Sequence, residues 1–140
     1  SDVPGYAMQP WTPALSFLGV RTGITYGQLS GQYVKVGDII FAFYWFVLTS
    51  KGAAVGQARL ENLPFRTSSS SGTGFHQGQG GCISYWANMN TALVNFGMLM
   101  QANYVIFVGG AAGATSIASL TDTDFLDTSE VAGTIIYSNP

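Results

Sequence analysis

The sequence predicts an all-β domain, and three features of its 140 residues support this prediction. Short runs rich in Val, Ile, Phe, Tyr and Trp alternate with clusters of Gly, Ser and Thr, which is the pattern of short strands joined by turns. No long stretch carries apolar side chains with the 3.6-residue period of a helix; residues 88–99 come nearest, and Asn, Thr and Gly interrupt them. Apolar residues make up 47% of the chain, which is enough for a core.

A hairpin is the clearest local element. Residues 32–36 alternate between two faces, as a strand does. Gly37 and Asp38 follow as a two-residue turn, and Gly in the first position suits a type II′ hairpin turn. Residues 39–49 then form the returning strand. With the strands before it, the first half of the chain is expected to contain strands at 14–20, 24–29, 32–36 and 39–49.

The second half contains shorter strands, separated by turn residues. They are expected at 57–60, 82–86, 98–101, 104–108, 116–118 and 134–137. This number of short strands predicts an antiparallel β-sandwich that resembles a jelly roll. Residues 11–140 are expected to form this single domain, and residues 1–10 are expected to be a linker or the end of an upstream domain.

The chain contains few charges, and this excludes several function classes. Five Lys and Arg and seven Asp and Glu amount to 9% of the residues, against about 25% in a typical globular chain. Nucleic-acid binding needs clustered basic residues, so we expect no nucleic-acid partner. No apolar run approaches the ~18 residues of a membrane helix, so we expect no membrane insertion. Cys82 is the only cysteine, and no disulfide within the chain is possible.

The strand at 39–49 contains IIFAFYWFVL, which is apolar on both of its faces. In a strand, alternate side chains point to opposite sides, so one set can line the core and the other must also avoid water. A loop of the same chain or a neighbouring subunit can cover that second set. Residues 104–108 repeat the pattern, and two such strands favour an obligate oligomer. The sequence leaves open which face meets the partner, and we assign the interface to Ile40, Tyr44, Phe46, Tyr104 and Ile106.

Catalytic and metal-binding constellations are nearly absent from the sequence. His76 is the only histidine, and nothing orients it toward Cys82 as a nucleophile pair would require. The acidic segment LTDTDFLDTSE does not match a calcium loop. Thr121, Asp122 and Asp124 are instead residue types that cap a short helical turn. We therefore expect no enzyme activity, no cofactor and no metal, with a metal or ligand role for this segment as the weaker alternative.

Aromatic residues make up 14% of the chain and raise the possibility of sugar binding. An aromatic ring offers an apolar face to a sugar, although most aromatic side chains in proteins pack in cores or interfaces. The long polar segment at 67–81 ends just before an aromatic strand, and long loops are often functional. The candidate ligand-binding residues are Phe75, His76, Gln77, Gln79 and Trp86. A surface loop without a ligand is the plainer interpretation.

The order of several short motifs resembles a known family. The motifs are WTPALSFLG, TGITYGQLSGQYVKVGDII, LTSKG, ARLENLPF, LTDTDF and GTIIY, and together they run from Trp11 to Tyr137. This arrangement resembles the C-terminal domain of many tail spikes and tail fibres of tailed bacteriophages. The segment SSSSGTGFHQGQGG has no counterpart in that pattern, and FAFYWFVL is more aromatic than the pattern suggests.

The resemblance implies a jelly-roll-like β-sandwich that assembles as a homotrimer at the far end of a spike or fibre. It also implies a place in the virion, on the phage tail and outside the host cell. The implied function is to lock the trimer and to contribute to attachment to the bacterial surface, where a glycan is the expected partner. The alternative is a carbohydrate-binding module whose main role is to recognise a host polysaccharide. Catalysis in such spikes belongs to an upstream β-helix, which this chain does not contain.

Overall fold

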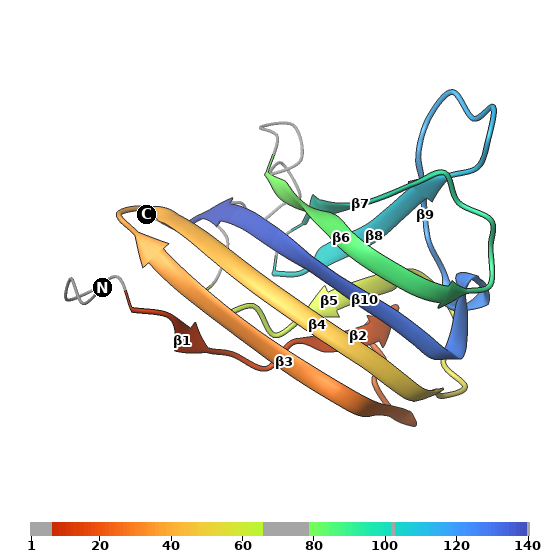
Figure 1. Cartoon of the computed structure of the whole chain (residues 1–140), viewed down its shortest axis with the longest axis horizontal. Helices are drawn as coiled ribbons and strands as arrows, with labels where there is room; N and C mark the ends of the chain where they lie inside the picture. The colour runs from red at the N-terminus through yellow and green to blue at the C-terminus, as the bar shows by residue number, and fades with distance from the viewer. Residues whose placement is uncertain (1–6, 66–78, 102, 140) are drawn as a thin grey trace.

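The computed structural model describes residues 7–65, 79–101 and 103–139, and within them ten strands form one continuous antiparallel sheet (Figure 1). The strands are β1 (Gln9–Pro10), β2 (Ala14–Phe17), β3 (Ile24–Val36), β4 (Ile39–Lys51), β5 (Ala58–Glu61), β6 (Gly80–Met89), β7 (Asn95–Met100), β8 (Val105–Gly110), β9 (Ala118–Ser119) and β10 (Phe125–Ser138). The predicted all-β class is therefore confirmed. β1 lies within the range predicted as a linker, and it pairs with β3.

The sheet curls over itself into two layers. The strand order is β1-β3-β4-β10-β6-β7-β8-β5-β2, with β9 paired to β8. β1, β3, β4, β10 and β6 form a front layer, and β7, β8, β5 and β2 lie behind it (Figure 1). β6 joins the layers because only its first residues, Gly80 to Cys82, pair with β7. The predicted sandwich is thus built from one hydrogen-bonded sheet.

The β3–β4 hairpin forms most of the front layer. Val36 pairs with Ile39 across the Gly37–Asp38 turn, as predicted. Gly37 has φ +60°, and Asp38 is not among the residues with positive φ, which agrees with a type II′ turn. β3 is one strand where the sequence predicts two: Ser30 and Gly31, which lie between the two predicted strands, pair with Trp45 and Tyr44 in continuous register.

β10 is the central strand of the front layer, paired with β4 on one side and β6 on the other. It begins directly after a one-turn 3₁₀ helix, η2 (Asp122–Asp124). Thr121 caps this turn: its Oγ1 accepts a hydrogen bond from the Thr123 N–H, and its own N–H donates to Asp124 Oδ2 at 2.8 Å. The predicted capping role of this segment is confirmed.

The core between the layers is rich in aromatic side chains. Phe107 of β8 lies near the centre, with ring centroids of Tyr44, Phe46, Phe96 and Phe125 between 5.9 and 6.5 Å away. These contacts are edge-to-face, the geometry that the ring quadrupoles favour. The core therefore joins β4 and β10 of the front layer to β7 and β8 behind them.

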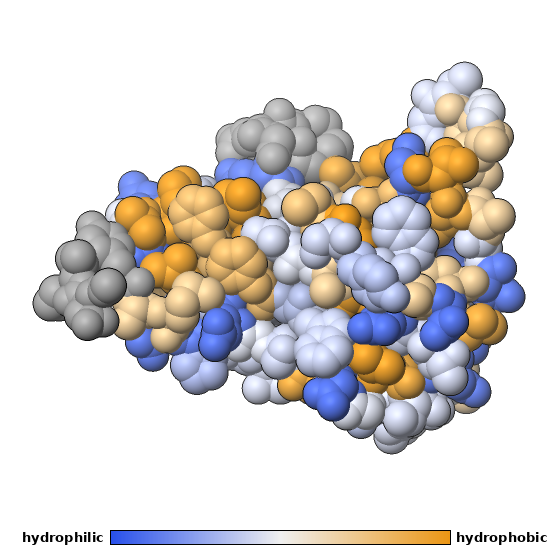
Figure 2. Space-filling view, viewed as in Figure 1, coloured by the Kyte–Doolittle hydropathy of each residue, from blue (hydrophilic) through white to orange (hydrophobic). Residues whose placement is uncertain are grey.

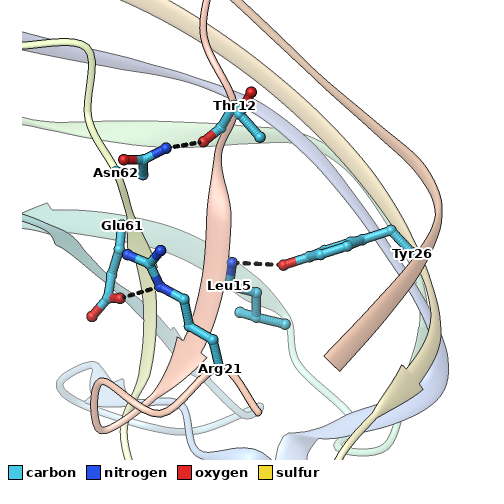
Figure 3. A network of polar contacts seen from close by, with 6 residues as sticks. All are labelled: Thr12, Leu15, Arg21, Tyr26, Glu61 and Asn62. Atoms are coloured by element: carbon cyan, nitrogen blue, oxygen red, sulfur yellow. Dashed lines mark hydrogen bonds and ion pairs between the residues drawn. The ribbon is translucent and has the colours of Figure 1, made fainter. Parts of the chain in front are cut away.

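A polar network holds the edge strand β2 in place (Figure 3). The Leu15 N–H of β2 donates to the Tyr26 hydroxyl of β3 at 3.0 Å, which satisfies a backbone group that would otherwise lack a strand partner. On the other side, Asn62 donates to the Thr12 carbonyl at 2.7 Å, and Arg21 forms an ion pair with Glu61. The edge strand β2 is therefore tied to β3 of the front layer as well as to its neighbour β5.

The raised pKa of the Tyr137 hydroxyl leads us to expect a loss of stability at high pH. Its hydroxyl donates to the Phe65 carbonyl and accepts from the Phe65 N–H, and burial raises its pKa to about 12 against the lowering effect of that backbone hydrogen bond. The unfolded chain loses the same proton near pH 10. Stability from this group is therefore fully present below pH 10 and is lost as the pH rises toward 12.

Urea unfolding at pH 9 and above pH 11 would measure this effect, and the expected loss is about 2 kcal/mol. The matched variant is Tyr137→Phe, which keeps the ring and removes the ionisable hydroxyl. It should be less stable at neutral pH and should lose less between the two pH values. An equal loss in both proteins would assign the alkaline transition to other groups.

Candidate functional face

β4 places its two apolar sets on different sides of the front layer. Ile40, Tyr44 and Phe46 are 0%, 3% and 0% exposed and belong to the core, whereas Phe43 and Trp45 are 39% and 37% exposed on the outside. The predicted interface residues Ile40, Tyr44 and Phe46 are therefore assigned to the wrong face. Both faces of the strand are apolar, so the sequence of β4 alone does not distinguish them.

Tyr104 and Ile106, the other predicted interface residues, belong to the rear of the molecule. Ile106 lies in β8, is 5% exposed and pairs with Arg59 of β5. The Tyr104 ring lies under the Arg59 guanidinium, 4.3 Å from its carbon, in a cation–π contact. These two residues therefore do not share a surface with β4, and the five predicted interface residues form no common patch.

The outward side chains of β3, β4 and β10 form rows across the front layer, because paired residues lie side by side. The two rows nearest the Gly37–Asp38 turn are Val36, Ile39 and Ser138, followed by Val34, Phe41 and Ile136. We call the five apolar members of these rows the apolar end. Val36, Ile39 and Ile136 are 39–45% exposed, and neither row contains a charge. Figure 2 shows apolar residues gathered at this end of the molecule.

The next rows mix aromatic and polar side chains. They are Gln32, Phe43 and Thr134; then Ser30, Trp45 and Ala132; then Gln28, Val47 and Glu130. A shallow groove of about 270 Å³ lies here, between β1, β3 and β4. Its lining consists of Pro10, Ser30, Gly31, Gln32, Phe43, Tyr44 and Trp45. The front face thus has an apolar end and, in the rows next to it, a groove; neither was among the predicted sites.

Two tryptophans fix the geometry of this groove. Trp45 Nε1 donates to Glu130 Oε2 at 2.8 Å, which holds the indole in one orientation on the surface. From the core side, Trp11 Nε1 donates to the carbonyls of Gln32 and Phe43 at 3.1 and 3.0 Å. Gly31 permits this approach, since a Cβ there would lie 2.7 Å from the Trp11 indole nitrogen. The groove floor is therefore held rigidly before any ligand binds.

Of the five predicted ligand-binding residues, the structure describes two, Gln79 and Trp86, and these two lie apart. Phe75, His76 and Gln77 lie outside the described residues. Gln79 precedes β6, where its side-chain carbonyl accepts from the Ser138 N–H. Trp86 lies seven residues further along the extended chain, roughly 20 Å away, and packs against Phe96 with 5.5 Å between ring centroids. Gln79 and Trp86 therefore cannot contact the same small ligand.

The described residues contain no group of three or more His, Cys, Asp or Glu side chains positioned to hold a metal ion. In the same part of the chain, no helix is both long and apolar enough to cross a membrane.

One solved structure with a similar fold is the crystal structure of the Dettilon tailspike protein (gp208). The TM-score is 0.70 and the sequence identity is 16%, over 94% of this chain and 23% of the tailspike chain. The likeness shows that the two share a fold, and this chain spans about a quarter of the tailspike's length. No family model matches the chain, and no curated protein matches it in sequence.

Proposed function

We propose that this domain belongs to a bacteriophage tail spike or tail fibre, where it locks a homotrimer and contributes to attachment to the bacterial surface. The domain then works on the phage tail, outside the host cell. The sequence motifs from Trp11 to Tyr137 and the fold shared with a tailspike protein support this context. The proposal assigns the domain no catalytic activity.

The observation that carries the proposal is the apolar end of the front face. Its five apolar side chains are contiguous, and the two rows of paired residues that contain them include no charged side chain. The five are Val34, Val36, Ile39, Phe41 and Ile136. Exposed apolar patches of this kind on soluble proteins mark interaction sites. Further copies of the same chain are the proposed occupants, because a homotrimer is what the resemblance to tail spikes implies.

This arrangement also explains the scarcity of charge in the chain. Obligate interfaces resemble a core cut in half, and charged residues are depleted at their centres. Two charged residues, Lys35 and Asp38, are next to members of this group in sequence. The Lys35 ammonium turns away from the apolar end: it lies 5.2 Å from the Phe65 ring centroid and donates to Asn139 at 3.1 Å. Asp38 lies in the exposed turn beyond the two rows. A subunit contact centred on the two rows therefore buries apolar side chains without burying the Lys35 ammonium.

Sedimentation equilibrium at micromolar concentration tests the proposal. The protein should have three times the 14.8 kDa mass of one chain. Ile136→Lys places a charge within the apolar end and should yield folded monomer, since a buried unpaired ammonium strongly disfavours the contact. Val55→Lys is the matched control: Val55 is 73% exposed and lies outside the front layer, so this variant should stay trimeric.

A monomeric wild-type protein would overturn the proposal. So would an Ile136→Lys variant that assembles as well as Val55→Lys. Circular dichroism on each variant shows whether a loss of assembly reflects the interface or a failure to fold.

A further inference from the structure

We infer that the groove between β1, β3 and β4 binds a neutral glycan of the bacterial surface. This inference deepens the attachment part of the proposed function and names its ligand class and site. It uses Phe43 and Trp45 with Gln32 and Ser30, none of which belongs to the apolar end. The two sites therefore lie on one face and can be tested separately.

The aromatic side chains form a platform of the kind that sugars stack on. Phe43 and Trp45 are two residues apart in β4, so they point to the same side, about 7 Å from each other along the strand. Both are more than a third exposed, although each is large and apolar. An exposed ring face can pack against the C–H groups of a sugar ring while the sugar hydroxyls remain in contact with polar groups.

Polar groups suited to sugar hydroxyls lie beside this platform. The register places Gln32 opposite Phe43 and Ser30 opposite Trp45. Both side chains are exposed, and no hydrogen bond links either one to another side chain among the described residues. The Gln32 amide can donate and accept, and the Ser30 hydroxyl can do the same. Binding pockets typically combine such an apolar lining with a few polar groups that orient the ligand.

The absence of charge in the groove lining favours a neutral ligand, and the rigidity of the groove favours binding. The groove lining contains no Lys, Arg, His, Asp or Glu, so it offers no countercharge to an anionic ligand. The nearby Glu130 carboxylate, which accepts from Trp45, would repel one. The bonds from Trp45 to Glu130 and from Trp11 to the groove floor hold the platform in position, which lowers the entropic cost of binding.

The same polar groups argue against a second dry subunit contact at the groove. A subunit packed over this region would cover the Gln32 amide and the Ser30 hydroxyl, and burial without hydrogen-bond partners is unfavourable. The apolar end contains no such groups among its five members. Water or a hydroxyl-rich ligand can form hydrogen bonds with the Gln32 amide and the Ser30 hydroxyl, whereas an apolar surface cannot.

Two-dimensional ¹H–¹⁵N NMR of the assembled protein tests this inference, with glucose, galactose, mannose, rhamnose and N-acetylglucosamine each added to about 100 mM, enough to detect millimolar binding. At least one sugar should shift the Trp45 indole and Gln32 amide signals in a saturable way. Galacturonate, the anionic counterpart of galactose, should shift them less. Trp45→Ala and Gln32→Ala should each weaken the response about tenfold or abolish it.

Trp86→Ala is the matched control, since Trp86 is equally exposed at 38% but lies away from the groove on β6, and its response should match the wild type. No saturable shift with any of the five sugars would overturn the inference. Shifts that survive Trp45→Ala, or that equal those with galacturonate, would overturn it too. Sedimentation of Trp45→Ala should still show the trimer, so loss of sugar binding and loss of assembly are distinguishable.

Discussion

Replacing Phe46 by Ala is expected to lower the free energy of unfolding by about 3–5 kcal/mol. Phe46 is fully buried, and its ring packs against Tyr26, Tyr44 and Phe107 with centroid distances of 6.2 to 6.3 Å. Truncation removes the apolar contacts of the ring and leaves a cavity between the two layers. The three neighbouring rings belong to strands that are held in place by backbone hydrogen bonds. They therefore cannot move far enough to fill the cavity.

Urea unfolding at one fixed protein concentration measures the change, because the proposed assembly would make stability depend on concentration. Phe43→Ala is the matched control: it removes the same ring from the same strand, but on the outer face, where Phe43 is 39% exposed. We expect a loss of no more than about 1 kcal/mol there. Equal losses at the two positions would mean that the two faces of β4 are not divided between core and exterior.

The hairpin illustrates how much of this fold the sequence predicts. The Gly37–Asp38 turn and the strands on both sides of it follow from local chemistry, and the structure has them in the expected places. The choice of inner face does not follow, because IIFAFYWFVL offers apolar side chains to both sides. Contacts of Tyr44 and Phe46 with Phe107, which comes from a distant strand, decide it, and the local pattern contains no information about them.

The sequence predicts only a short part of β10, and the physical reason is different. Residues 134–137 are the only part of it that the pattern predicts as strand, although the strand runs from Phe125 to Ser138. Two of its inward positions are Ser129 and Gly133, which do not look apolar. Ser129 is buried because its hydroxyl donates to the Asn88 carbonyl at 2.7 Å and accepts from the Leu126 N–H at 2.9 Å. Because Ser129 and Gly133 occupy inward positions, the sequence of β10 does not show the alternation of apolar and polar residues that is typical of a strand.

The side chains of the groove can be paired from the sequence, whereas the placement of Gln79 relative to Trp86 cannot be inferred from it. Counting back from the Gly37–Asp38 turn pairs Gln32 with Phe43 and Ser30 with Trp45, so the turn alone places these side chains together. The set containing Gln79 and Trp86 relied on nearness in sequence. An extended strand separates residues by about 3.3 Å each, so nearness in sequence means little across β6.

Gly133→Ala is expected to prevent normal folding, with a loss of more than about 4 kcal/mol. Gly133 faces the core in β10, where β6 shifts its register. A Cβ at this position would lie 2.2 Å from the Cys82 carbonyl oxygen and 2.7 Å from the Tyr44 hydroxyl. The Tyr44 hydroxyl itself is held by a contact to the Met98 sulfur at 3.1 Å. Relief therefore requires β6 and β10 to separate at the centre of the front layer.

Soluble yield, circular dichroism and urea unfolding measure the effect. Gly97→Ala in β7 is the matched control, since the nearest atom to a Cβ there is Val108 Cγ2 at 3.8 Å, and this variant should fold with nearly unchanged stability. Adding Tyr44→Phe to Gly133→Ala removes the contact with the hydroxyl but leaves the backbone contact with Cys82, so it should not restore folding. A Gly133→Ala protein as stable as Gly97→Ala would show that β10 and β6 are not packed this closely.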